Sequence, residues 1–269
     1  MTTRFREAAH NGGIAPLLEV RGVTLQYKTA QHLVTATYRV DFEVFRSDRF
    51  VLLGPSGCGK STLLKAVGGY IEPTEGGIAL NGVPVSEPGP DRMMVFQEFD
   101  QLLPWKSVLE NVVFPLVKSG KLRRAAAREK ALDAIEKVGL SNFVHSLPHT
   151  LSGGMKQRVA IARGIAMEPD ILLMDEPFAS LDALTRRKMQ DELLALWQGT
   201  HFTVLFVTHS IPEAIRIGSR ILLLTPHPGQ VKAELNSTND CASSAESAAL
   251  EARIHELLFS DSVETISHA

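Results

Sequence analysis

Three kinds of feature are scarce in this 269-residue sequence, and each absence excludes a class of protein. The only two cysteines, Cys58 and Cys241, make no disulfide framework and are typical of a reducing compartment. No stretch approaches 18 uninterrupted apolar residues, and the N-terminus lacks the apolar core of a signal peptide, so we expect a soluble, cytoplasmic chain. Lys and Arg number 28 against 30 Asp and Glu. Without a basic excess, nucleic acid is a poor candidate partner.

The order of apolar runs and turns predicts an α/β fold in one domain, with room for sub-domains. Residues 1–14 are expected to form a flexible lead. Short β-rich runs over residues 17–53 predict antiparallel strands that lead into a central buried strand, and Asn81-Gly82 is a predicted hairpin corner. Residues from about 98 to 168 are mostly helix-compatible, with one apolar face made by Ala131, Ala134, Ile135 and Val138.

Buried strands return after the helical segment, at residues 171–176 and 203–209, as parallel strands between helices require. A last strand is predicted at residues 220–225. Residues 236–247 resemble a linker, and residues 248–259 predict a short amphipathic terminal helix.

A glycine-rich loop, GPSGCGKST at residues 54–62, follows an apolar strand and precedes a helix-compatible run. It matches the G-x-x-x-x-G-K-[ST] phosphate loop, whose glycines let backbone N–H groups turn toward a phosphate at a helix N-terminus. We expect Lys60 to reach the β- and γ-phosphates, Ser61 to ligate Mg²⁺ and Thr62 to contact the α-phosphate. The candidate nucleotide-binding residues are Gly54, Pro55, Ser56, Gly57, Cys58, Gly59, Lys60, Ser61 and Thr62.

An acidic pair, Asp175 and Glu176, ends a buried strand, where ligands bind in open α/β sheets. Asp175 is a candidate to coordinate Mg²⁺ through water, and Glu176 is the candidate base that orients the attacking water. A surface Asp-Glu pair with no catalytic role is the alternative. The phosphate loop in the same chain favours the catalytic interpretation.

Four single residues are weaker candidates. His209 ends a strand and is a candidate donor to the γ-phosphate, and Gln97 is a candidate contact to Mg²⁺ or to the attacking water; a structural histidine and a polar strand end are the alternatives. Tyr27 is a candidate to stack on adenine, with Tyr38 as its competitor and a core position as the alternative. Cys58, by its position in the loop, is predicted to react with thiol reagents with loss of ATP binding.

A second glycine-rich stretch, LSGGMKQR at residues 151–158, has the pattern of an anion-binding helix start. Ser152 is a candidate cap for a helix from Met155 to about Met167, and Gly153 and Gly154 leave backbone N–H groups open to an anion; an ordinary helix cap is the alternative. One phosphate chain cannot use two such loops in one monomer. In a head-to-tail dimer, the second loop of one copy closes over the γ-phosphate held by the other copy, and ATP joins the two.

Taken in order, GPSGCGKST, LSGGMKQR and ILLMDE resemble the Walker A, signature and Walker B motifs of the ATP-binding cassette (ABC) ATPases. The resemblance implies a P-loop NTPase core with a mixed sheet, an N-terminal antiparallel β subdomain and an inserted helical subdomain. It implies an ABC ATPase domain at residues 15–235, with the helical subdomain at about 98–168 and a linker and short helix at 236–269. In this family Gln97 corresponds to the loop that couples to membrane subunits, Asp182 to the dimer-contact loop and His209 to the switch histidine.

A finer likeness involves PGPDRMMVFQEFDQLLPW, DEPFASLDALTR and TPHPGQV, which are similar to segments of the nitrate, sulfonate and taurine importer ATPases. It implies a homodimer beneath two transmembrane permease subunits at the cytoplasmic face of the inner membrane, fed indirectly by a periplasmic or lipid-anchored solute-binding protein. ATP and Mg²⁺ are the implied cofactors. Nitrate, taurine, aliphatic sulfonates, bicarbonate and pyrimidine precursors are open as solutes. Gly164 stands where the family often has alanine.

Two other classes share some of these features. A soluble ABC ATPase that acts on ribosomes or DNA usually has two cassettes or a long coiled-coil insertion, and neither is seen here. A P-loop kinase leaves the second glycine loop without a role.

Overall fold

The computed structural model describes residues 5–6, 15–28, 32–97, 101–237 and 244–259, and these form two compact units. The first unit combines residues 1–88 with residues 203–269, and the second comprises residues 89–202. Most of the predicted lead, residues 1–14, lies outside the described residues. Its described part, β1 (Phe5–Arg6), pairs in parallel with β11 (Val231–Asn236).

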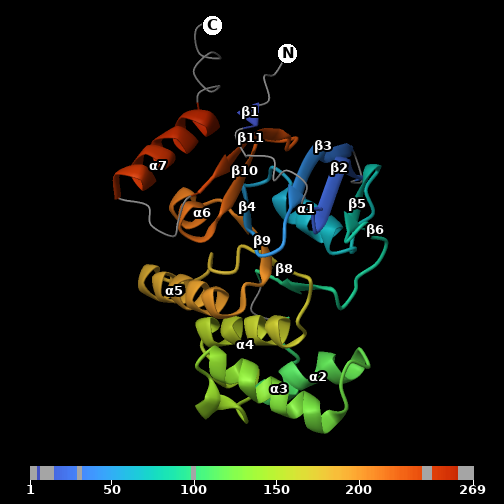
Figure 1. Cartoon of the computed structure of the whole chain (residues 1–269), viewed down its shortest axis with the longest axis vertical. Coiled ribbons are helices and arrows are strands. Elements are labelled where there is room, and N and C mark those ends of the chain that lie inside the picture. Colours follow the sequence, from blue (N-terminus) through green and yellow to red (C-terminus); the bar gives the residue numbers. More distant parts are fainter. Residues whose placement is uncertain (1–4, 7–14, 29–31, 98–100, 238–243, 260–269) are drawn as a thin grey trace, which may run out of the picture. The chain divides into compact units, whose positions relative to one another are not determined.

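Five strands of the first unit run in the order β1-β11-β10-β4-β9 (Figure 1). β4 (Arg49–Leu53) lies between β9 (Thr203–Thr208) and β10 (Arg220–Leu224) and is parallel to both. Every residue of β4 and β9 is buried, which explains their continuous apolar sequences. Helices α1 (Lys60–Val67) and α6 (Ile211–Ile217) follow β4 and β9, and α7 (Ser244–Phe259) packs on α6.

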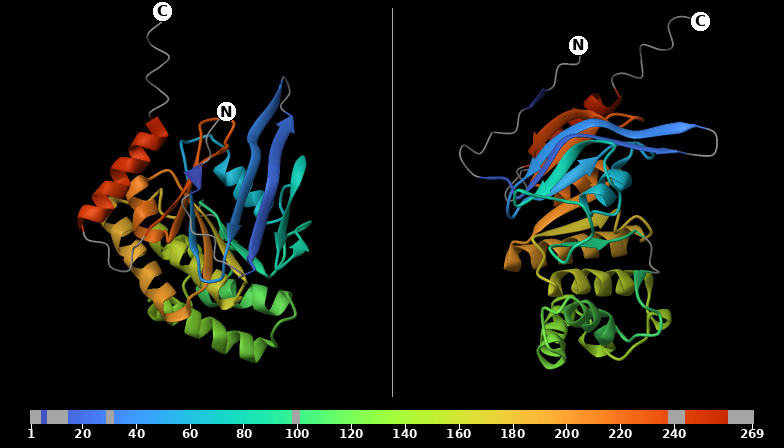
Figure 2. Two further views of the ribbon diagram at one scale, coloured as in Figure 1. Left: turned by 45° about the horizontal axis from the view of Figure 1, so that its top comes forward. Right: turned by 90° about the vertical axis from the view of Figure 1, so that its right-hand side faces the viewer.

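An antiparallel sheet completes the first unit, in the order β3-β2-β5-β6. Figure 2 shows β2 (Leu18–Lys28) and β3 (Leu33–Val44) as a long twisted ribbon. β5 (Glu75–Leu80) and β6 (Val83–Pro84) meet at the predicted corner, where Leu80 pairs with Val83. The intervening Asn81 and Gly82 have φ angles of 50° and 75°, as a two-residue type I′ turn requires.

The second unit contains two parallel strands, β7 (Arg92–Val95) and β8 (Ile171–Asp175), and four α-helices among its described residues. These are α2 (Val108–Lys118), α3 (Arg124–Lys137), α4 (Gly153–Ala166) and α5 (Ala183–Thr200), with 3-10 turns η2 (Ser141–Phe143) and η3 (Pro148–Thr150). α2, α3 and α4 pack on one another, and the apolar face predicted from Ala131 to Val138 is buried. At Gly164 of α4, an added Cβ would lie 2.7 Å from Cδ1 of Leu172, so glycine lets this helix approach β8 closely.

Two terminal predictions differ from the structure. The sequence predicted a last strand at residues 220–225, but β11 follows it and pairs antiparallel with β10. The run VKAELN alternates apolar and polar residues, a strand signal that the sequence reasoning missed. The C-terminal helix begins at Ser244 rather than Ala248. Among the described residues, no helix combines the length and apolar character needed to cross a membrane.

Arg220 is the centre of a partly buried ion-pair network in the first unit. Its guanidinium donates to the carboxylates of Asp48, at 2.7 Å, and of Glu234. It also lies 4.9 Å from the ring centre of Phe50. Because the Glu234 side chain is only 4% exposed, removal of the arginine would leave a buried carboxylate without this cation.

We predict that Arg220→Met lowers the free energy of unfolding by about 3 kcal/mol, measured by urea denaturation. Adding Glu234→Gln should recover part of the loss, because the uncompensated charge is then removed. The control is Arg187→Met, at an exposed position of α5. A loss below about 1 kcal/mol for Arg220→Met, as is typical of exposed pairs, would contradict this assignment.

Candidate nucleotide site

The predicted phosphate loop lies between β4 and α1 in the first unit. Gly57 and Gly59 have φ angles of 79° and 96°, in the left-handed region that glycine adopts without strain. α1 begins at Lys60, within the loop motif and directly after Gly59. A helix start presents backbone N–H groups and the positive end of the helix dipole, so this geometry suits a phosphate group.

Lys60 is the buried cation of the loop and is only 4% exposed. Its ammonium donates to the carbonyl oxygens of Gly54 and Pro55, at 2.7 and 2.8 Å. In the structure the lysine therefore holds the loop in shape.

Three backbone segments meet at the phosphate loop, because Gly59 within the loop and Gly229 outside it have no side chain to keep them apart. A Cβ at Gly59 would lie 2.5 Å from the carbonyl oxygen of Ala36 in β3. A Cβ at Gly229 would lie 2.1 Å from the carbonyl oxygen of Cys58. The N–H of Gly229 donates to Ala36 O at 3.0 Å, and its carbonyl accepts from the N–H of Tyr38. Gly229 belongs to the TPHPGQV segment, to which sequence reasoning assigned no role.

Cys58 is less accessible than its position in the loop suggested. It is 1% exposed, and its Sγ lies 3.9 Å from Lys60 Nζ. Burial raises the pKa of the Cys58 thiol, and the neighbouring Lys60 charge offsets only part of this effect. Since the thiolate is the reactive form, the structure argues against the predicted ready alkylation.

The two aromatic candidates for adenine both lie on the surface of the antiparallel sheet. Tyr27, near the end of β2, is 51% exposed, and Tyr38, in β3, is 39% exposed. The guanidinium of Arg39 lies 5.4 Å from the ring centre of Tyr38. Neither tyrosine is a core residue, so the core alternative is wrong for both. Which of them stacks on adenine stays a prediction.

His209 follows the last residue of β9 and is exposed, and Ser210 caps the helix after it. The first unit thus holds the phosphate loop, His209 and both tyrosines.

In the second unit, the acidic pair and Gln97 follow neighbouring strands. β7 and β8 are parallel, with Val95 opposite Met174, so Gln97 and Asp175 lie at the same edge of this strand pair. Asp175 is buried at the end of β8, and Gln97 is exposed. Glu176 has a φ of 42°, a left-handed conformation that is unusual for glutamate and costs of order 1 kcal/mol or more. Strain of this kind is concentrated at functional sites.

The second glycine loop forms the start of α4, which begins at Gly153 rather than at the predicted Met155. Ser152 is exposed, and its Oγ accepts from the N–H of Met155 at 3.3 Å. A Cβ at Gly154 would lie 3.3 Å from Cγ2 of Thr185 in α5. This glycine therefore lets the start of α4 lie beside the start of α5.

Asp182 caps α5 next to this loop. Its Oδ1 accepts from the N–H groups of Leu184 and Thr185 at 3.1 and 3.0 Å. Hydrogen bonds from the Thr185 side chain and backbone hold the pKa of Asp182 below its usual range. The structure thus brings Ser152, Gly154 and Asp182 to neighbouring helix starts within the second unit.

Gln101 is a residue of this unit that sequence reasoning missed. Its amide clamps the backbone of Phe96, next to Gln97, accepting from the N–H at 3.1 Å and donating to the carbonyl at 2.8 Å. Arg163 of α4 donates to the carbonyl of Gln101 at 2.8 Å. The segment that carries Gln97 is thereby tied to the helix that begins at the second glycine loop. A single polar residue outside any periodic pattern gives no sequence signal for such a clamp.

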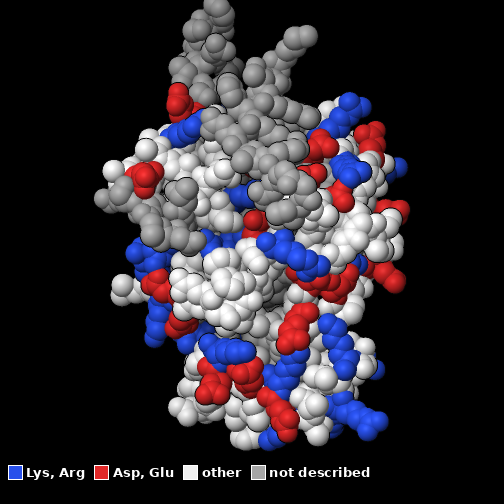
Figure 3. All heavy atoms as spheres, viewed as in Figure 1, with Lys and Arg blue, Asp and Glu red and all other residues white. Residues whose placement is uncertain are grey.

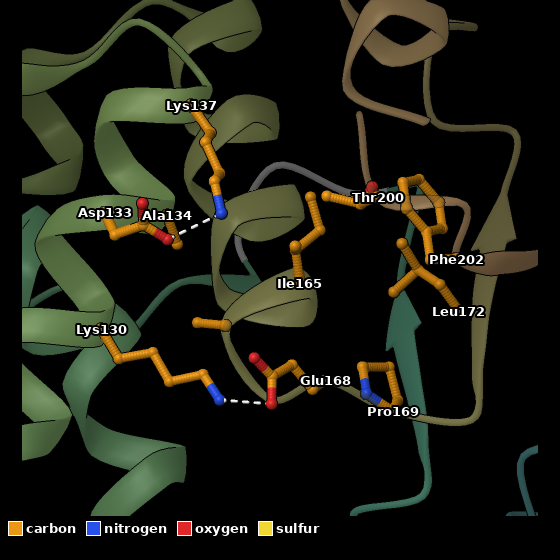
Figure 4. A pocket seen from close by; sticks show the side chains of 11 residues that line it. Lys130, Asp133, Ala134, Lys137, Ile165, Glu168, Pro169, Leu172, Thr200 and Phe202 are labelled. Carbon is orange, nitrogen blue, oxygen red and sulfur yellow. Dashed lines mark ion pairs between the residues drawn. The ribbon is translucent and has the colours of Figure 1, made fainter. Parts of the chain in front are cut away.

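A pocket of about 340 Å³ in the second unit is not part of this arrangement (Figure 4). Its charged residues are paired, Lys130 with Glu168 at 2.6 Å and Lys137 with Asp133 at 2.7 Å. α3, α4 and α5 all end beside it, and the C-terminal ends of helices carry partial negative charge. The pocket therefore does not suit a phosphate chain, and none of the predicted nucleotide-binding residues lines it.

The surface charge agrees with the sequence composition. On the face seen in Figure 3, basic and acidic side chains are interspersed rather than separated into fields of one sign. Nothing on this face of the described residues resembles a basic track for nucleic acid.

A phosphate loop between a buried strand and a helix, with a second strand that ends in an acidic pair, defines a P-loop nucleotide hydrolase. The family model described as ABC transporter matches residues 38–179. The chain belongs to the ABC transporter family, as an ATPase of the ATP-binding cassette type. The family resemblance, the fold class and the ATPase activity predicted from the sequence are confirmed, and the ribosome- or DNA-associated alternative is not favoured.

Similar proteins include the taurine import ATP-binding protein TauB of Rhizobium johnstonii, 48% identical over 76% of this chain and 77% of the relative. The nitrate import ATP-binding protein NrtD of Synechococcus elongatus is 44% identical over 73% and 72%. Among solved structures, the dimeric ABC transporter cassette MJ0796 has a TM-score of 0.72 and 34% identity, covering 81% of this chain and 98% of that one.

Gly229→Ala is predicted to weaken ATP binding, because the new methyl group would displace the backbone of Cys58 and with it the phosphate loop. We expect at least a tenfold rise in the dissociation constant for ATP, measured by titration calorimetry. Gly199→Ala is the control, since no atom lies within 4 Å of an added Cβ there. Unchanged ATP affinity in Gly229→Ala would show that the loop does not depend on this contact.

Proposed function

We propose that this chain is the ATP-hydrolysing subunit of an importer for a small anionic solute, such as a sulfonate, taurine or nitrate. The relatives named for taurine and nitrate import support this proposal, at 48% and 44% identity. The observation that carries it furthest is the presence of two anion-binding helix starts, at Lys60 and at Gly153, in one chain.

The two loops are explained by a head-to-tail dimer. In it, the Ser152 loop of one copy faces the γ-phosphate held by the Lys60 loop of the other, and two-fold symmetry creates two such sites. Asp182, beside the second loop, is then placed at the dimer contact. The dimer in the solved structure of MJ0796 supports this arrangement.

The residues suit ATP with Mg²⁺. A serine hydroxyl, a glutamine amide and a carboxylate, on Ser61, Gln97 and Asp175, are the oxygen ligands that Mg²⁺ prefers. When bound, Mg²⁺ neutralises charge on the β- and γ-phosphates. Lys60 adds a further positive charge at the same phosphates, and the N–H groups at the start of α1 orient them.

Glu176 is the base in this mechanism. Its carboxylate orients the attacking water and accepts its proton, while His209 donates a hydrogen bond to the γ-phosphate. Glu176 directly follows β8, and its left-handed φ is a strained backbone conformation of the kind that is concentrated at functional sites.

The second unit also has a surface suited to the permease subunits. A groove of about 190 Å³ on α2 is lined by Phe114 and Val117, which are 40% and 42% exposed, with Lys106 and Arg124 at its rim. Trp105, which precedes α2, is 71% exposed. Exposed aromatic and aliphatic side chains of this kind mark protein contacts, so we assign this groove to a cytoplasmic segment of each membrane subunit. The chain then works at the cytoplasmic face of the inner membrane.

Glu176→Gln is expected to lower ATP turnover by at least 100-fold, because a general base contributes about that much or more. The variant should still bind ATP and should elute as a dimer with ATP and as a monomer without it. Glu129→Gln, at an exposed position of α3, should hydrolyse ATP at the wild-type rate. Near-normal turnover in Glu176→Gln would remove Glu176 from the role of base, and an ATP-independent monomer would contradict the dimer.

A further inference from the structure

The residues on both sides of His209 are joined in a ring of hydrogen bonds. The hydroxyl of Thr208 donates to Oε2 of Glu213 at 2.5 Å. The same hydroxyl oxygen accepts from the N–H of Ser210 at 3.0 Å, and Ser210 Oγ accepts from the N–H of Glu213 at 3.4 Å. Thr208 and Glu213 are 1% and 7% exposed, whereas His209 is exposed. The ring thus holds the backbone before and after an exposed side chain.

This arrangement is a capping box with one added group. In the usual form, a glutamate at the third helical position accepts directly from the N–H of the capping residue. Here the Thr208 hydroxyl stands between the two groups: its one proton is donated to the Glu213 carboxylate, so its oxygen is left to accept from the N–H of Ser210. The end of β9 is thereby joined to the start of α6.

The glutamate itself is held firmly. α6 packs on β4 and β9 through buried residues such as Ala214 and Ile217. On its other side lies α7, with Ile254 and Leu258 buried (Figure 1). Ser237 donates to the carbonyl of Ile215 at 3.1 Å. α6, which carries Glu213, is therefore packed against β4 and β9 and against α7.

We propose that Glu213 is a positioning residue that, through Thr208, holds His209 in the orientation needed for ATP hydrolysis. This inference rests on the proposed role of His209 at the γ-phosphate. In this assignment Glu213 and Thr208 act through the backbone on either side of His209 rather than by contact with the nucleotide. Their loss therefore lowers kcat while the KM for ATP stays the same, because the phosphate loop is untouched.

The decisive variant is Thr208→Val, which keeps the shape of the side chain and removes the hydroxyl. We expect kcat to fall at least tenfold with KM within twofold of wild type, and Thr208→Ser to restore most of kcat. Glu213→Gln keeps an acceptor oxygen and should lose less than Thr208→Val. The matched control is Thr203→Val, which removes a buried hydroxyl at the other end of β9, where it accepts from the N–H of Ser47. The control should lower the melting temperature and leave kcat unchanged.

A double-mutant cycle with His209→Ala separates positioning from general stability. In the His209→Ala protein, Thr208→Val should cause no further fall in the residual rate. If Thr208→Val lowers kcat by the same factor in the His209→Ala protein as in the wild type, the inference is overturned. It is also overturned if Thr208→Val has wild-type kcat while His209→Ala is impaired. In both cases the proposed role of His209 stands. Wild-type kcat in His209→Ala overturns the proposed role of His209, and the inference with it. If the residual rate is too low to measure, a Thr208→Ser enzyme as slow as Thr208→Val overturns the inference.

Discussion

The close approach of three backbone segments at the phosphate loop is the contact on which the rest of the site depends. A Cβ at Gly59 would lie only 2.5 Å from the carbonyl oxygen of Ala36, and a Cβ at Gly229 only 2.1 Å from that of Cys58. Any side chain at either glycine would force these segments apart. The loop therefore packs against the backbone of β3 and of the segment between β10 and β11. Within the loop, the Lys60 ammonium donates to the carbonyls of Gly54 and Pro55.

Function in this chain depends on local electrostatics rather than on net charge. The whole sequence carries a formal charge of −2, yet α1 and α4 begin at Lys60 and Gly153 with the positive end of a helix dipole, which favours an anion. The segments that carry Gln97 and His209 are held by hydrogen bonds: Gln101 clamps the backbone beside Gln97, and the Thr208 hydroxyl joins the backbone beside His209 to Glu213. These bonds lie outside the motifs themselves.

Much of the fold could be predicted because local sequence and tertiary structure agree. The buried strands, the Asn81-Gly82 corner and the capped start of α4 each have a strong short-range signal. The Ser210-x-x-Glu213 spacing is the sequence signature of a capping box and was missed, whereas the clamp by Gln101 could not be predicted, because it depends on a contact that forms only after folding. The burial of Cys58 was missed for the same reason: the motif places it in a loop, and β-sheet packing decides its exposure.

The central claim is that each active site combines the phosphate loop of one copy with the second glycine loop of another. The most direct test is the ATPase turnover of a mixture of Lys60→Met and Gly153→Asp chains. The aspartate is chosen because a negative charge stabilises the start of α4 but repels a phosphate. Each variant alone should be inactive. An equal mixture should regain about a quarter of wild-type turnover, because half of the dimers are mixed and each mixed dimer has one intact site of two. A mixture no more active than the separate variants would contradict the shared site.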